Sequence, residues 1–260
     1  MEKAKNKVFI VSDVHGCAKE LLLLLTKWNP EEEFLIINGD IVDRGANSKQ
    51  VIGIVYRLVL DGFAVVNWGN HDRMMWDFLQ IEPEEDPHDF IDTYYLWYYQ
   101  GGRETSDSIL NKDTTTLTPE QLQIELKAHT YVTDLMGLMT WYYEFGNVLI
   151  VHAGVPPEYQ LNIKATPKLD LIWYRGHYKA PNRTGKVMVS GHTPTHIIRN
   201  GGDDIWFNTK EDIYLIDGAC AYGGQLNGVV FSREGKLIDS YVVKNGELIV
   251  KQEDGVKVSD

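Results

Sequence analysis

The stretch Val8-Phe9-Ile10-Val11-Ser12-Asp13-Val14-His15-Gly16, residues 8–16, decides the fold of this chain. Its first four residues are β-branched or aromatic, and so short an apolar run predicts a buried strand rather than a helix. Asp13 and His15 follow that strand two positions apart, so both side chains can point to one face while Val14 points away. A carboxylate and an imidazole presented together suit one metal ion. The stretch therefore predicts a strand with metal ligands at its carboxyl end.

The same arrangement, a short apolar run that ends in Asp, Asn or His, recurs four times along the chain. These runs are 34–37, 64–66, 148–151 and 187–189, and they lead to Asp40, Asn70, His152 and His192. Helical spacing at 21–28 and 51–59 separates the first three strands, with Ser48 as a candidate N-cap of the second helix and Gly62 just past its end. Alternating strands and helices imply a parallel core sheet, whose ligands collect at the carboxyl ends of the strands. We therefore expect one shared site.

Residues 73–145 interrupt this alternation, and we expect them to form a mostly helical insertion. Thr118, Pro119 and Gln121 have the pattern of a capped helix start. The acidic segment 82–87 is expected to be a solvated loop. The aromatic run 94–99 fits insertion core better than a platform for stacking nucleobases. The sequence leaves the functional role of the insertion open.

After His192 the chain turns to strand patterns, at 213–216, 228–231, 238–243 and 248–250, separated by Gly and charged residues. We expect these strands to form a terminal antiparallel meander. No internal repeat or linker divides the chain, and 260 residues fit one α/β domain with an insertion, spanning 1–260.

Composition excludes several classes of protein. The chain is 43% hydrophobic and 24% charged, which is typical of a folded globular protein rather than a disordered one. Its net charge of −12 repels a phosphate backbone, so we expect no nucleic-acid partner. Only two cysteines occur, Cys17 and Cys220, and no apolar run approaches the roughly 18 residues of a membrane span. We expect a cytoplasmic protein without a membrane partner, and two small buried thiols.

The strand-end residues predict a metal centre of mixed oxygen and nitrogen ligands. Asp40 could bridge the ion at Asp13 and His15 to a second ion, whose site Asn70, His152 and His192 would complete. Such donors suit Mn²⁺, Fe or Zn²⁺, and they disfavour Ca²⁺ and thiolate-rich structural zinc. Two ions about 3.5–4 Å apart can clamp a phosphoryl group and supply a hydroxide at neutral pH. We expect two divalent ions, with Mn²⁺ as first choice.

Five blocks of this sequence, taken in order, resemble the five signature blocks of the calcineurin-like metallophosphoesterases. They are residues 13–16, 39–45, 69–72, 151–154 and 191–193. The Asp-Arg-Gly ending of the second block resembles the phosphoprotein phosphatase branch, which also holds bacterial and phage serine/threonine protein phosphatases and the symmetrical diadenosine tetraphosphatases. The resemblance runs from Asp13 to about Phe231. It implies an α/β/β/α sandwich of four layers.

The resemblance also implies roles for individual residues. Asp13, His15 and Asp40 match the ligands of one metal. Asp40, Asn70, His152 and His192 match those of the other, with Asp40 bridging. His71 matches the proton donor to the leaving oxygen, Asp43 the carboxylate that orients it, and Arg44 and Arg175 the arginines that hold the phosphate.

Other segments extend or depart from the family pattern. Residues 101–105 and 217–226 also resemble bacterial members, and the second segment makes Tyr222 a candidate to line the site. Asp72 stands where this branch usually has Glu, and Ser12 stands where the first block usually begins with Gly. His88, His129, His177 and His196 match no block, so we expect them to be surface or core residues.

We therefore expect an enzyme, a metal-dependent phosphoesterase. The favoured substrate is phosphoserine or phosphothreonine in protein, and the alternative is a dinucleoside polyphosphate such as diadenosine tetraphosphate, held by stacking. A phosphate-binding scaffold without catalysis is disfavoured, because such proteins typically lose a ligand or the acid, whereas this chain keeps Asp40, Asn70 and His71.

Overall fold

The first of two β-sheets contains the strand predicted at residues 8–11. A computed structural model describes residues 5–199 and 201–250. The sheet has the order β11-β10-β9-β1-β2-β3. Its parallel strands are β1 (Lys7–Val11), β2 (Glu33–Asn38) and β3 (Ala64–Asn67). Its antiparallel strands, β9 (Gln225–Ser232), β10 (Leu237–Lys244) and β11 (Glu247–Val250), confirm the last three strands of the expected meander.

The second sheet has the order β4-β5-β6-β8-β7. Its strands are β4 (Tyr142–Phe145), β5 (Val148–Val151), β6 (Val187–Ser190), β7 (Trp206–Asn208) and β8 (Ile213–Leu215). The prediction that 213–216 begins the meander is wrong, because β8 pairs in parallel with β6 in this sheet. The crossover between them includes α9 (Thr195–Arg199), and a connection of this length is what a parallel pair requires.

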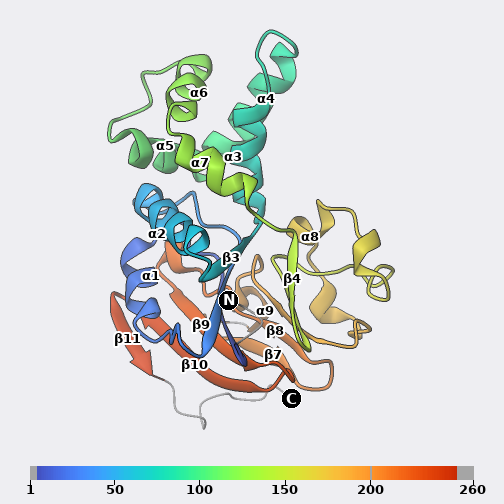
Figure 1. Cartoon of the computed structure of the whole chain (residues 1–260). Helices are drawn as coiled ribbons and strands as arrows, with labels where there is room; N and C mark the ends of the chain where they lie inside the picture. The colour runs from blue at the N-terminus through green and yellow to red at the C-terminus, as the bar shows by residue number, and fades with distance from the viewer. Residues whose placement is uncertain (1–4, 200, 251–260) are drawn as a thin grey trace.

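The two sheets pack face to face between helices, which confirms the four-layer fold. Alternate residues of β1 separate cleanly: Val8 and Ile10 pack between the sheets, whereas Phe9 and Val11 pack toward the helices. On that outer face lie α1 (Ala18–Leu25), against β9 and β10, and α2 (Ser48–Leu60), against β3 (Figure 1). On the outer face of the second sheet, Leu171 of the short helix α8 (Asp170–Trp173) joins the cluster formed by residues of β5 and β6.

Helices fill most of the insertion and gather at one end of the molecule (Figure 1). They are α3 (Asn70–Gln80), α4 (Pro87–Trp97), a π-helical turn (Tyr98–Gly102), α5 (Arg103–Leu110), α6 (Pro119–Lys127) and α7 (Thr130–Gly137). The predicted cap of α6 is confirmed, because Thr118 and Gln121 exchange hydrogen bonds. Residues 142–145 are not helical, since they form the edge strand β4.

The predicted N-cap of α2 is wrong by one residue. Asn47 precedes the helix, and Ser48 is its first helical residue. The hydroxyl of Ser48 lies 3.0 Å from the Thr105 hydroxyl of α5. The Ser48 side chain therefore makes a tertiary contact instead of the helix cap that the local sequence pattern predicts. Among the described residues, no helix is long and apolar enough to span a bilayer.

The aromatic run confirms the core interpretation for part of its length. Tyr94, Trp97 and Tyr98 are buried, and the Trp97 ring stacks on Phe78 of α3 at 5.2 Å between centroids. Tyr95 and Tyr99 lie on the other side of the helix and are exposed. Trp97 is therefore fully enclosed in the insertion, whereas Tyr94 and Tyr98 are mostly buried and only border a pocket of about 410 Å³.

Candidate metal centre

The loops after β1, β2, β3, β5 and β6 meet at one place, so both sheets contribute to the centre. All six expected ligands are buried there: Asp13, His15, Asp40, Asn70, His152 and His192. Asp40 is central, with its Oδ2 3.4 Å from Nε2 of His15 and 3.5 Å from Nε2 of His152. Two groups of candidate ligand atoms, each within 4.8 Å of one another, share Asp40: one with His15 and His71, the other with His152 and His192.

The backbone at this centre adopts a conformation that the sequence pattern did not reveal. Six site residues have positive φ, between 44° and 72°: Asp13, His15, Asp40, Asp43, Arg44 and His192. Few non-glycine residues adopt this left-handed region, and residues held there cluster at functional sites. The neighbouring glycines permit the close packing, because a Cβ at Gly69 would overlap Asp40 and a Cβ at Gly191 would overlap Asp13.

Hydrogen bonds fix which nitrogen of each imidazole faces Asp40. The ring Nδ1 of His15 donates to the Val42 carbonyl at 2.8 Å, and Nδ1 of His152 donates to the Asn38 carbonyl at 2.9 Å. A carbonyl only accepts, so Nδ1 carries a proton in both rings, and Nε2 is the atom of each neutral ring that can present a lone pair to the centre. Among the described residues, Nε2 of His192 is buried without a hydrogen-bond partner. An orphaned imidazole nitrogen beside carboxylate, amide and imidazole donors fits a transition-metal ion.

The electrostatics of the centre require a cation beside Asp40. Burial lowers the pKa of His15 and of His152, but the hydrogen bond and charge of Asp40 outweigh it and raise these values to about 9 and about 10. Burial raises the pKa of Asp40, yet the surrounding imidazoles hold it well below its usual value. Burial and the charges of His152 and Arg175 lower the pKa of His192 to about 2. The carboxylate of Asp40 is therefore ionised, and protons or metal ions must balance it.

A hydrogen-bonded chain of three residues borders the centre. His71, at the start of α3, donates from Nδ1 to Asp43 Oδ2 at 2.8 Å. The two terminal nitrogens of Arg44 donate to Nε2 of His71 at 2.7 Å and to Nε2 of His15 at 2.6 Å. The Arg44 guanidinium also lies over the ring of Tyr222, 4.9 Å from its centroid. The structure thus brings His71, Asp43 and Arg44 together as the sequence predicted.

Two further residues of the chain were not expected near Asp43. Its Oδ1 accepts hydrogen bonds from Nε1 of Trp97 at 3.0 Å and from the hydroxyl of Thr105 at 2.9 Å, and these residues lie 54 and 62 positions away. Thr105 belongs to the segment 101–105, whose resemblance to bacterial members of the branch marks the segment but assigns no role to Thr105. Trp97 gave only a core signal.

The two departures from the family pattern also contact the ligands. Asp72 is buried and accepts hydrogen bonds from the backbone N–H groups of Asp40, Ile41 and Gly69, at 2.7–3.0 Å, so it holds the loops after β2 and β3 together. Burial, with the charge of Asp40, raises the pKa of Asp72 to about 7. The hydroxyl of Ser12 lies 2.5 Å from Asp13 Oδ2 and 2.9 Å from the Asn38 carbonyl.

The sequence model of the family described as calcineurin-like phosphoesterase matches residues 6–225. The chain belongs to this family. It is a metal-dependent phosphoesterase, and the family uses a dinuclear metal centre of the kind that these His and Asp groups could form.

Relatives of this phosphoesterase differ in the substrates that their names give. It is 26% identical over 249 residues to an asymmetrical bis(5′-nucleosyl)-tetraphosphatase, PrpE, of Oceanobacillus iheyensis, covering 86% of this chain and 88% of the relative. It is 28% identical over 211 residues to serine/threonine-protein phosphatase 2 of Salmonella typhimurium, covering 78% and 86%. A solved protein serine/threonine phosphatase from Saccharomyces cerevisiae superposes with a TM-score of 0.58 at 15% identity, covering 96% of this chain and 82% of the other, and so supports the fold alone.

A cavity of about 850 Å³ opens beside the metal centre of this phosphoesterase. It is lined by Arg44, Arg175, Tyr178, Lys179, His192, Thr193, Pro194, His196, Ile197 and Tyr222. Both expected phosphate arginines therefore face one cavity together with His192, and Arg175 donates to the Thr193 hydroxyl at 3.2 Å. His196 lies at the cavity although it matches no signature block, whereas His177 is buried in the core.

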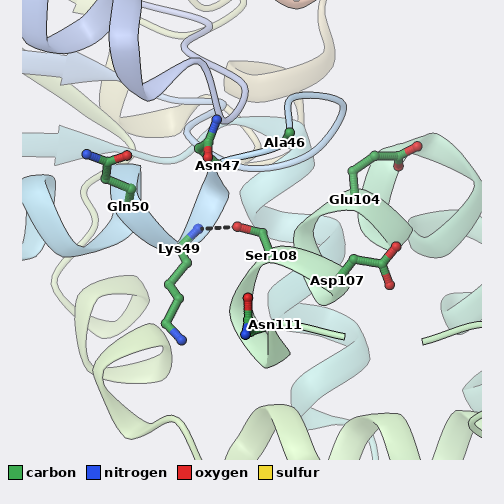
Figure 2. Close-up of a pocket in the computed structure, with 8 residues that line it drawn as sticks. All are labelled: Ala46, Asn47, Lys49, Gln50, Glu104, Asp107, Ser108 and Asn111. Atoms are coloured by element: carbon green, nitrogen blue, oxygen red, sulfur yellow. Dashed lines mark hydrogen bonds between the residues drawn. The ribbon is translucent and has the colours of Figure 1, made fainter. Parts of the chain in front are cut away.

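A second cavity, of about 600 Å³, lies between the start of α2 and α5 (Figure 2). Its lining contains Lys49, Glu104 and Asp107, and the Lys49 backbone donates to the Ser108 hydroxyl at 3.1 Å. The Lys49 ammonium extends away from both acids (Figure 2) and donates to the Ile109 carbonyl at 3.0 Å. None of the expected metal ligands or phosphate arginines lines it. We therefore place the chemistry at the first cavity.

Proposed function

We propose that this chain hydrolyses phosphate monoesters with two divalent ions, and that its substrates are phosphoserine and phosphothreonine in proteins. The observation that carries the chemistry is the position of Arg44. Its guanidinium contacts both His15 of the metal centre and His71, and it opens onto the same cavity as Arg175. Two planar guanidinium groups beside a cation centre suit a phosphoryl group.

The metal ligands are assigned in two sets that share one carboxylate. Asp13, His15 and Asp40 would hold one ion, and Asp40, Asn70, His152 and His192 the other. The central place of Asp40 and the unpaired Nε2 of His192 support this division. Mn²⁺ is the first choice, with Fe and Zn²⁺ as alternatives. Ions bound there would supply Lewis acidity and lower the pKa of a bound water.

His71 is assigned as the general acid rather than as a metal ligand. It comes within reach of the first set, but its Nδ1 donates to the Asp43 carboxylate, whereas Nδ1 of His15 donates to a backbone carbonyl. The Asp43 carboxylate fixes Nδ1 as a donor and stabilises the imidazolium. Nε2, which accepts from Arg44 in this structure, would carry and deliver the proton to the departing oxygen once Arg44 turns to the phosphate. Arg44 and Arg175 would hold the equatorial oxygens of the phosphate as their charge develops.

The burial of aromatic side chains in the insertion favours a phosphoprotein as substrate. The aromatic side chains considered for nucleobase stacking, Tyr94, Trp97 and Tyr98, are mostly or fully buried, and none of them lines the cavity that holds Arg44 and Arg175. A phosphorylated side chain needs only the arginines and the metal centre at the cavity floor. The alternative, a dinucleoside polyphosphate, has one observation in its favour: Lys179, Tyr178 and Tyr222 line the same cavity and could bind additional phosphates and a base.

The two substrates can be compared directly on Mn²⁺-loaded protein. We expect a higher kcat/KM for a phosphothreonine peptide than for diadenosine tetraphosphate, and little effect of Tyr178→Ala on either beyond stability. Tyr99→Ala, which removes an exposed tyrosine that does not line this cavity, is the matched control. A Tyr178→Ala variant that raises KM for the nucleotide by the equivalent of ~1–3 kcal/mol, with p-nitrophenyl phosphate hydrolysis unchanged, would reverse the choice of substrate.

A further inference from the structure

A second group of metal-type ligands lies outside the catalytic centre. The thiols of Cys17 and Cys220 and the carboxylate of Glu20 have their ligand atoms within 4.8 Å of one another. The two cysteines are 203 positions apart in sequence, and all three side chains are half-buried. Their meeting is therefore a product of the tertiary fold.

Local structure explains why these side chains converge. Cys17 immediately precedes α1 and Glu20 is its third residue, so they lie one turn apart on the same side of the helix start. Cys220 begins a 3₁₀ turn (Cys220–Tyr222) after Ala219, whose φ is +55°. The turn is held by hydrogen bonds from the Ala219 N–H to Asp217 Oδ1 at 2.9 Å and from the Gly224 N–H to the Ala219 carbonyl at 3.1 Å.

No cationic side chain of the described residues pairs with the carboxylate of this group. Within residues 5–199 and 201–250, the Glu20 carboxylate has no hydrogen bond or salt bridge, and neither cysteine forms a disulfide. The ammonium of the adjacent Lys19 extends to Gly246 instead. The Cys17 thiol lies in hydrogen-bonding contact with the Cys220 thiol and 3.6 Å from the His15 carbonyl. A half-buried carboxylate beside two free thiols is an environment that a bound cation would stabilise.

We propose that Cys17, Glu20 and Cys220 bind one thiophilic divalent ion of the zinc class, separate from the catalytic pair. Two thiolates, a carboxylate and a water would complete a tetrahedron, whose bonds of about 2.0–2.3 Å separate the ligand atoms by about 3.3–3.8 Å. The two thiol protons pass to solvent on binding, and no electron is transferred. The donor chemistry differs from that of the catalytic centre, which contains no sulfur.

Such an ion would fasten the 3₁₀ turn to the start of α1. The turn ends at Tyr222, which packs over Arg44, and Cys17 follows the loop that holds Asp13 and His15. The ion would therefore brace one wall of the cavity from outside it. Its binding is independent of the substrate that the catalytic centre takes.

Cobalt binding tests the site with a signal that catalysis does not contribute. The reduced full chain is titrated with Co²⁺, because thiolate ligands give a near-ultraviolet charge-transfer absorption and oxygen or nitrogen ligands do not. We expect the final absorption in the natural protein to correspond to one thiolate-bound ion per chain, in addition to the ions that the catalytic centre takes up, and to be lost in Cys17→Ser and Cys220→Ser. Glu20→Gln should weaken cobalt binding by at least about tenfold, whereas Glu31→Gln, an exposed acid on the surface, should not change it.

The absence of the absorption in the natural protein, or its survival in both serine variants, would overturn the proposal. If the serine variants do not fold, the natural protein still decides the question. Bound zinc should protect both thiols from a disulfide reagent, and an unchanged rate of reaction would count against the site. Phosphatase activity enters neither measurement, so failure here is distinct from failure of the proposed function.

Discussion

Replacing Trp97 with Phe should slow catalysis although Trp97 does not line the cavity. Asp43 is fully buried, and its Oδ1 accepts hydrogen bonds from Trp97 and Thr105 while its Oδ2 accepts from His71. A carboxylate held at three points keeps His71 in a single orientation. Phe preserves a ring against Phe78 but removes the N–H group.

The size of the effect follows from the hydrogen bond that is lost. A hydrogen bond to a charged group contributes about 1.5–3 kcal/mol. Because Thr105 still donates to the same oxygen, we take the lower end of that range. About 1.5 kcal/mol in the activation free energy corresponds to a fall in kcat of about tenfold.

The assay compares two substrates and two backgrounds. On a phosphothreonine peptide, a poor leaving group, Trp97→Phe should lower kcat by about tenfold. On p-nitrophenyl phosphate the loss should be smaller, because that leaving group needs less protonation. In a His71→Asn background the substitution should have little further effect, since it acts through His71. Trp28→Phe is the matched control, because Trp28 donates to the Glu33 carbonyl far from the centre.

Equal losses on both substrates, or an undiminished loss in the His71→Asn background, would refute the positioning role of Trp97. They would assign Trp97 to packing alone. Melting temperatures of both tryptophan variants, measured alongside, report that packing contribution.

Three other predictions concern the centre and the core. Chelation should abolish hydrolysis of p-nitrophenyl phosphate, and Mn²⁺ should restore it; full activity of metal-free protein would contradict the mechanism. Among the ligand variants, Asp40→Asn should reduce the metal content most, as measured by elemental analysis. His71→Asn should lower kcat on the phosphothreonine peptide by about 10²–10⁴-fold while metal content is unchanged; loss of metal would make His71 a ligand. Burial lowers the pKa of His177 from 6.5 to about 4, so the unfolded chain binds more protons between these values and stability falls as pH falls through them. Urea unfolding of the chelated protein measures this effect. Between pH 7 and pH 5 the free energy of unfolding of the natural protein should fall by about 2 kcal/mol more than that of His177→Gln. Equal falls in the two proteins would remove His177 as the cause.

Much of the fold could be predicted because its signals are local. The strands at 8–11, 34–37, 148–151 and 187–189 are short apolar runs, and the capped helix start at Thr118 is encoded within four residues. The gathering of His152 and His192 with the residues of the first sheet followed from one geometric rule, that parallel strands present their ends together. That rule held although the strands belong to two sheets.

What the sequence could not predict depends on contacts between distant segments. The pairing of β8 with β6 rather than with the terminal strands is a choice among strands of similar composition. Serine is a common helix N-cap, yet the hydroxyl of Ser48 contacts Thr105 instead. The left-handed backbone at Asp13 and Asp40 leaves no mark in hydrophobic spacing, because Asp tolerates that region without glycine.

The contact between Trp97 and Asp43 gives the insertion a place in the chemistry. A buried carboxylate that lost its hydrogen bonds would carry an unsatisfied charge, and such charges are costly in an apolar interior. The insertion supplies two of the three side-chain donors to Asp43, and the tryptophan among them is also packed in the insertion's aromatic core. Packing of that core and orientation of His71 therefore depend on the same side chain. Substitutions that loosen the core around Phe78 should for this reason reach the proton donor without touching the metal ligands.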